Sequence, residues 1–122
     1  MPATYRLETE RSLVVLTLTG VVTPAELDAI RARIREDPAF GPSFSVLADA
    51  SELNPAALTG DAVRARAAKP PIYPMRIAIV APADVVFGIA RMYQMMTEGS
   101  GTTVAVFRDP TEAMAWLASG SR

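Results

Sequence analysis

The sequence predicts a single α/β domain over residues 1–122, with a mostly parallel sheet of five strands and four helices. Short apolar runs alternate with segments of helical periodicity, in the predicted order ββαβαβαβα. Such alternation is typical of parallel strands joined by right-handed crossovers. Half of the residues are hydrophobic, which is enough for one core without disulfides or metal. No repeat or break in composition marks a second domain.

The first two strands should form an antiparallel hairpin whose first strand lies at the edge of the sheet. Tyr5, Leu7 and Thr9 alternate with charged residues, the period of a half-exposed strand. Glu8, on the solvent side of that strand, should titrate normally. The run 13–18 lacks alternation, which indicates a strand covered on both faces.

Helix-start signals locate the helices. Thr23, Pro24 and Glu26 form the pattern of a capping box with proline at the first helical position. Further helices are expected over 62–68 and from Asp84 to about Glu98. A similar cap, proline and glutamate begin the last helix at 109–112. The remaining strands are predicted at 44–48, 76–81 and 103–107.

The composition excludes several chemistries. The chain has no cysteine and no histidine, which removes thiol and imidazole catalysis and most zinc sites. We therefore expect no enzyme activity and no cofactor. The net charge is −1 and the basic residues form no excess, so we expect no nucleic-acid partner. Arg31, Arg33 and Arg35 are interpreted as a solvated helix face.

The sequence predicts a soluble, cytoplasmic protein with no membrane span. The longest apolar segment, 13–22, is far shorter than the roughly 20 residues that a membrane-spanning helix needs. The first six residues lack the charged start and apolar middle of a signal peptide.

Asp49 is the most interesting carboxylate. It follows a predicted core strand, at the edge where α/β sheets place their ligands. An enzyme could use Asp49 as a base, with Arg91 or Tyr93 as electrostatic support. The simpler interpretation is an aspartate that forms a turn, with its side chain bonded to nearby backbone amides.

The predicted helix 84–98 carries more apolar surface than one core face needs. Met92 and Tyr93 belong to its core stripe, together with Val85, Val86, Ile89 and Met96. Phe87, Arg91 and Met95 fall off that stripe, and methionines recur on adaptable binding surfaces. We therefore consider an apolar ligand pocket or a dimer contact near this helix as a second hypothesis. The proline-rich loop 70–74, with Ile72 and Tyr73 expected to be exposed, could contribute to either.

Nearly the whole chain resembles the SpoIIAA-like branch of the STAS superfamily, which shares features with the Sec14 lipid-binding fold. The resemblance rests on the hairpin ending in Leu18-Thr19-Gly20, the strand 46–49, the stretch 87–93 and the C-terminal segment 107–117. It implies a sheet with helices packed around it and a non-enzymatic role.

In the anti-sigma-factor antagonists of that superfamily, an Asp-Ser pair precedes the second helix and the serine is phosphorylated. The resemblance puts that pair at Ala57 and Leu58, and neither residue can do this. Thr59 and Gly60 match the residues that follow. Thr59 could accept a phosphate, although a helix cap already explains it. A phospho-switch is therefore not expected.

Three hypotheses follow. The first is a binding module that docks another protein or itself, as a homodimer, in a bacterial regulatory context. The second is a carrier or sensor of a small apolar molecule or lipid, held between the methionine-rich helix and the sheet. The third is an enzyme of unknown type. The residues expected to contact a ligand or partner are Asp49, Ser51, Thr59, Tyr73, Phe87, Arg91, Met92, Tyr93 and Met95.

Overall fold

The computed structural model describes residues 2–71, 73 and 75–119. In this part of the chain, five strands and four α-helices follow one another in the predicted order, with short 3-10 turns at Thr9–Arg11 and Pro55–Ala57. The elements are β1 (Ala3–Glu8), β2 (Leu13–Val21), α1 (Pro24–Glu36), β3 (Ser45–Asn54), α2 (Gly60–Ala67), β4 (Arg76–Val80), α3 (Asp84–Met96), β5 (Thr103–Phe107) and α4 (Pro110–Ser119).

The strands lie side by side in sequence order, β1-β2-β3-β4-β5. β1 pairs antiparallel with β2, and the other neighbouring strands pair parallel. The predicted hairpin, its edge strand and the mostly parallel sheet are therefore confirmed. Each crossover between parallel strands contains one helix, as parallel pairing requires.

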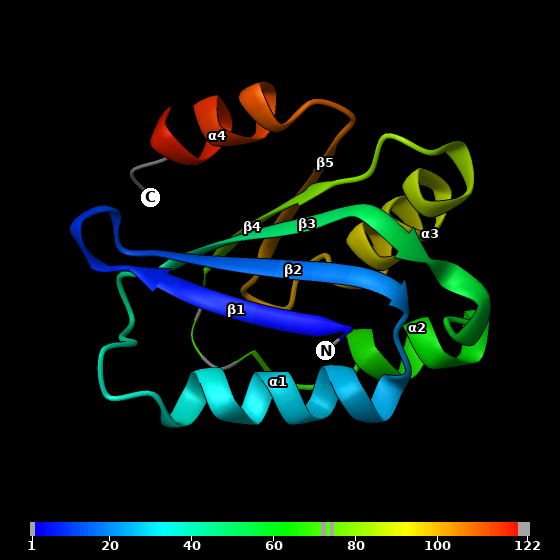
Figure 1. The fold of residues 1–122 in the computed structure, drawn as a ribbon, viewed down its shortest axis with the longest axis horizontal. Helices are drawn as coiled ribbons and strands as arrows, with labels where there is room; N and C mark the ends of the chain where they lie inside the picture. Colours follow the sequence, from blue (N-terminus) through cyan, green and yellow to red (C-terminus); the bar gives the residue numbers. More distant parts are fainter. Residues whose placement is uncertain (1, 72, 74, 120–122) are drawn as a thin grey trace.

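The helices divide unequally between the two faces of the sheet. Figure 1 shows α4 on one side and α1 with α2 on the other. Apolar side chains of α1 and α3 pack against Leu16 and Ile79 respectively, on what we call the three-helix face. Val15, Leu47 and Ala78 point the opposite way and pack against α4, on the single-helix face. Successive residues of a strand alternate between these faces.

The start of α1 matches its sequence signal. The Glu26 amide donates a hydrogen bond to Thr23 Oγ1 at 3.1 Å, and the Thr23 amide donates to Glu26 Oε1 at 2.8 Å. This reciprocal pair satisfies two amides that the helix leaves free. Ile30 and Ile34, one turn apart, are buried against the sheet.

The end of α1 is fastened to the edge strand. Tyr5 Oη donates a hydrogen bond to Asp37 Oδ2 at 2.8 Å, and the Ala39 amide donates to Asp37 Oδ1 at 3.0 Å. These two bonds, with the Ala39 amide as the larger influence, lower the pKa of Asp37. The hydrogen bond to Asp37 also raises the pKa of Tyr5.

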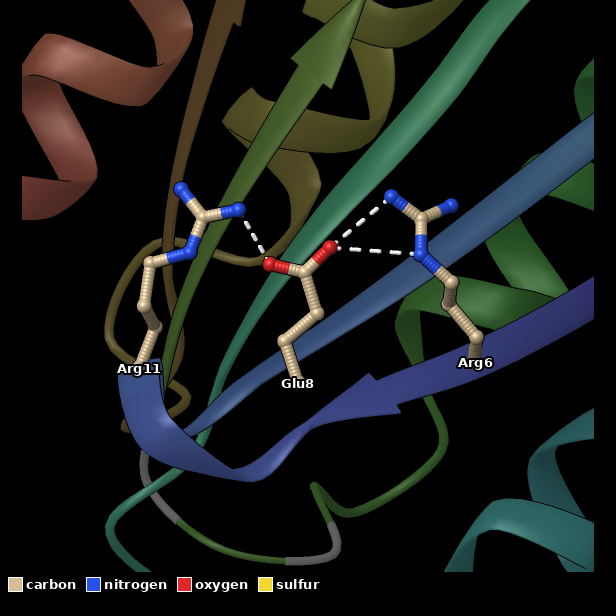
Figure 2. A network of polar contacts seen from close by, with 3 residues as sticks. All are labelled: Arg6, Glu8 and Arg11. Carbon is tan, nitrogen blue, oxygen red and sulfur yellow. Dashed lines mark hydrogen bonds and ion pairs between the residues drawn. The ribbon is translucent and has the colours of Figure 1, made fainter.

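Polar contacts close the turn between β1 and β2. Figure 2 shows the Glu8 carboxylate between the guanidinium groups of Arg11 and Arg6. Arg6 donates to Glu8 Oε2 from Nη2 and Nε, at 2.8 and 3.2 Å. Hydrogen bonds first from Arg11 and then from Arg6 lower the pKa of Glu8. The expectation that Glu8 titrates normally is therefore wrong, because Arg6 on the same strand and Arg11 in the turn both hydrogen-bond to its carboxylate.

β3 is longer than its sequence predicts, and this changes the place of Asp49. The strand was expected to end at Ala48, but it continues to Asn54. The continuation pairs with the end of β2 after a register shift between Thr17 and Thr19. Asp49 therefore lies inside a strand and not at its carboxyl end.

The predicted helix limits differ by a few residues. α2 begins at Gly60, two residues before the expected start, and ends at Ala67. α3 ends at Met96, because Thr97 adopts a non-helical conformation and its hydroxyl donates to the Gln94 carbonyl at 2.9 Å. Val85 was assigned to the core stripe of α3, yet its side chain is 65% exposed.

Candidate functional site

A cavity of about 350 Å³ lies on the three-helix face, between the sheet and helices α1, α2 and α3. Its floor is formed by side chains of the middle strands, and its walls by the three helices and the segment after α2. Aliphatic side chains supply most of the lining, including Leu16, Val46, Ile77 and Ile79 from the sheet.

The cavity exists because of where the helices rest and how small some side chains are. α1 packs mainly over the β1 edge and α3 mainly over β5, with less contact to β3, so the middle of the three-helix face is covered less closely. There β3 presents Ala48 and Ala50, whose methyl groups cannot fill the space. Alanines on the helices, such as Ala62 on α2 and Ala90 on α3, widen it further.

Polar groups gather at one part of the wall. Arg66 Nη1 of α2 donates to Asp28 Oδ1 of α1 at 2.9 Å, and Lys69 Nζ lies 3.7 Å from the same oxygen. Arg31, also on α1, donates to the backbone carbonyl of Pro70. All of these residues line the cavity.

Tyr93 of α3 lies close to this cationic group. Burial raises the pKa of its phenol, and the positive charges of Arg66 and Arg31 act in the opposite direction. Burial also lowers the pKa of Arg66, and the charges of Tyr93 and Asp28 offset this in part. The wall therefore combines half-buried cations with a half-buried phenol.

The structure separates the residues of the enzyme hypothesis. Ala48 and Ala50 face the cavity, so Asp49 between them points to the single-helix face, away from Tyr93. Its Oδ1 accepts a hydrogen bond from the amide of Ser51 at 3.0 Å, which is the local role expected of a turn aspartate. Ser51 itself is exposed on β3. Arg91 is exposed on α3.

Thr59 acts as the N-cap of α2. Its Oγ1 accepts a hydrogen bond from the amide of Ala62 at 3.1 Å. Leu58, where the resemblance places a phosphorylated serine, lines the cavity. The preceding Ala57 ends a 3-10 turn.

The proline-rich loop contributes differently from what was expected. Tyr73 was predicted to be exposed, but it is half-buried with its ring 5.6 Å from that of Phe40, which lines the cavity. Phe40 lies 33 residues earlier in the chain, so no local pattern in the sequence indicates that Tyr73 packs against it. Ile72, which was also expected to be exposed, lies outside the described residues.

On α3, the cavity does not use the methionines. Phe87 is half-buried beneath the Arg108 guanidinium, 4.2 Å from its ring centre. Met92 is half-buried and Met95 is 59% exposed, and neither lines the cavity. The cavity near this helix is instead lined by Val86, Ile89, Ala90 and Tyr93 of α3 and by Thr97, which follows it.

Sequence reasoning missed the cations of the wall. Arg31 was interpreted as part of a solvated face, yet it lines the cavity. Arg66 lies in an alanine-rich segment with weak periodicity, and its side chain is only 23% exposed. No local signal distinguishes such arginines, because α1 and α2 are brought together only by the fold.

Among residues 2–71, 73 and 75–119, no helix has the length and apolar character needed to cross a membrane. No cluster of acidic side chains there could hold a metal ion.

No protein-family model matches the sequence, and no curated protein matches it either. Among solved structures, the chain is similar to an uncharacterized protein of the DUF3478 family from Shewanella loihica PV-4, described as having a SpoIIAA-like fold. The TM-score is 0.60 at 16% sequence identity, over 94% of this chain and 91% of the other. At this identity the likeness concerns architecture alone. The chain has a SpoIIAA-like fold, as the resemblance in sequence implied.

Proposed function

We propose that this chain is a non-enzymatic module that binds a small apolar molecule in the cavity between the sheet and helices α1, α2 and α3. One observation carries this proposal, the cavity of about 350 Å³ with a mostly aliphatic lining. Ligand pockets are typically about 300–1,000 Å³ and predominantly apolar, with a few polar groups. The cavity has both features.

The volume sets the size of the ligand. An apolar cavity of about 150 Å³ holds one benzene molecule. By that measure, about 350 Å³ has room for a chain or ring system of roughly 12 to 14 carbon atoms. Each buried methylene contributes about 0.8 kcal/mol, from which the loss of ligand freedom must be subtracted.

This function corresponds to the second of the three sequence hypotheses. A SpoIIAA-like fold and the absence of histidine and cysteine are consistent with a non-enzymatic role. The separation of Asp49 from Tyr93 removes the support for the particular catalytic combination considered above.

Thermal unfolding with dodecanol tests the proposal. Dodecanol is neutral, has twelve carbons and fits the volume. A ligand at 100 times its Kd stabilises the folded state by about 2.7 kcal/mol, which for a domain of this size raises Tm by roughly 10 °C. We expect such a rise for the wild type.

The matched control is Ala48→Phe, which places a ring in the cavity. This variant should remain folded and show no rise in Tm with dodecanol. A wild type that responds no more than Ala48→Phe, to dodecanol or to shorter and longer alcohols, would contradict the proposal.

A second candidate function is self-association through the outer surface of α3. Val85 is 65% exposed and Met95 is 59% exposed, and a second copy of the chain packed on α3 would cover this apolar area. We expect a concentration-dependent dimer by light scattering that Met95→Glu weakens without lowering Tm. A monomer at all concentrations would exclude this candidate and leave the cavity proposal unaffected.

A further inference from the structure

The cavity wall carries an excess of positive charge. Among the described residues that line the cavity, Arg31, Arg66 and Lys69 are cationic, and Asp28 is the one carboxylate. Three positive charges against one negative charge leave a net charge of +2. The chain as a whole has a net charge of −1, so this excess is local to the site.

Arg66 is a largely buried cation whose carboxylate partner is more exposed than it is. Its side chain is 23% exposed, whereas the Asp28 side chain that pairs with it is 49% exposed. Asp28 is also shared with Lys69, 3.7 Å away. Burying a charge is unfavourable unless it is paired and hydrogen-bonded, and a guanidinium has five donors to satisfy. The observed pair with Asp28 uses one of the Arg66 nitrogens.

Tyr93 adds a neutral donor at the same place. It lines the cavity from α3, and the charges of Arg66 and Arg31 act on its phenol. Among the described residues, no other side chain forms a hydrogen bond with Tyr93 Oη. A phenol and a guanidinium that face one space are a suitable pair of donors for an oxyanion.

We propose, on the basis of the cavity-binding function above, that the ligand is a single-chain amphiphile with an anionic head group, of which a medium-chain fatty acid is the simplest. Its head group binds Arg66 with Arg31 and Tyr93, and its hydrocarbon chain lies along Val46, Ala48 and Ile79. The apolar floor and the cationic wall belong to one continuous cavity. That continuity distinguishes this ligand from a purely apolar one and from a small free anion.

Charge selectivity tests the inference. Dodecanoate and dodecanol have the same chain length and differ in the head group. Both would be titrated calorimetrically into the wild-type protein at neutral pH, below their aggregation concentrations. Because hydrogen bonds to charged groups are the stronger ones, dodecanoate should bind roughly tenfold to a hundredfold more tightly than dodecanol.

Two variants change that ratio in opposite directions. Arg66→Gln should remove most of the preference for dodecanoate over dodecanol. Asp28→Asn removes the competing carboxylate, so dodecanoate should bind several-fold more tightly than it does to the wild type. A gain in affinity cannot result from misfolding. Arg64→Gln is the matched control, since Arg64 is exposed on the same helix, pairs with Asp61 and does not line the cavity.

The outcomes separate this inference from the function on which it rests. If dodecanol and dodecanoate bind the wild type equally, and neither Arg66→Gln nor Asp28→Asn changes the ratio, the anionic head group is wrong and the apolar cavity function stands. If neither compound binds, both are wrong. An effect of Arg64→Gln as large as that of Arg66→Gln would mean general electrostatic attraction and would also overturn the inference.

Discussion

Replacing Ala48 by leucine should make the protein more stable, because the new side chain enters empty space. Ala48 lies on β3 at the floor of the cavity and is 7% exposed. In an ordinary core the same change would force neighbouring side chains apart and lower the stability by about 1–3 kcal/mol. The sign of the effect therefore reports directly on the cavity.

The magnitude follows from the carbon atoms that are added. Leucine has three more carbons than alanine, and burying them contributes about 2.4 kcal/mol at about 0.8 kcal/mol each. Fixing the leucine rotamer costs about 0.5–1 kcal/mol. Ala48→Leu should thus raise the free energy of unfolding by about 1.5 kcal/mol, which moves the urea midpoint up by roughly 1 M.

Ala78→Leu is the matched control. Ala78 lies on the neighbouring strand β4, opposite Leu47, and is fully buried beneath α4 on the single-helix face. Ala78 packs in one cluster with Ala113 and Leu117 of α4 and does not line the cavity, so the added carbons should lower the stability by about 1–3 kcal/mol. Urea unfolding of both variants beside the wild type measures the contrast. If Ala48→Leu loses as much stability as Ala78→Leu, the three-helix face is packed and the binding function loses its basis.

Three further predictions concern single side chains. Thr23→Ala should lower the free energy of unfolding by about 1 kcal/mol in urea, because the capping box of α1 is lost; an unchanged midpoint would refute this. Glu8→Gln should destabilise the protein at neutral pH but not in acid. The pKa of Glu8 is lower in the folded state, so its contribution is present above the ordinary value of 4.5 and disappears as the pH falls through the folded value. An equal loss of stability at pH 7 and pH 2 would contradict it. Tyr93→Phe should reduce the fall in the free energy of unfolding at alkaline pH. The pKa of Tyr93 is raised on folding, so the wild type loses this contribution as the pH rises past 10.0 and through the folded value, and unfolding from pH 8 to 12 measures it. Parallel pH profiles of variant and wild type would show that Tyr93 is not the group responsible.

Local signals in the sequence were sufficient for the order of the elements and for the hairpin at the sheet edge. They also located the start of α1, where Thr23 and Glu26 are three residues apart and bond to each other whatever the rest of the chain does. The end of β3 could not be predicted in this way. Whether residues 49–54 form a strand depends on the end of β2 lying beside them, and that is a pairing between distant segments.

The candidate site was predicted only in outline. An apolar pocket near residues 84–98 follows from surplus apolar residues on one helix, yet of the nine candidate residues Tyr93 alone lines the cavity. Periodicity shows which side chains of a helix share a face, but not which face meets a gap between neighbouring elements.

The sequence by itself determined the α/β architecture, because propensity, periodicity and capping act between residues close in the chain. It also determined what the protein lacks, namely imidazole and thiol groups. The cavity and its charge were decided by tertiary structure alone. They depend on α1 and α3 resting over opposite edges of one sheet face, and on α1 and α2 bringing Asp28, Arg31 and Arg66 to one wall. Contacts between side chains 35 or more positions apart, such as Arg66 with Asp28, arise from packing, and no local pattern encodes them.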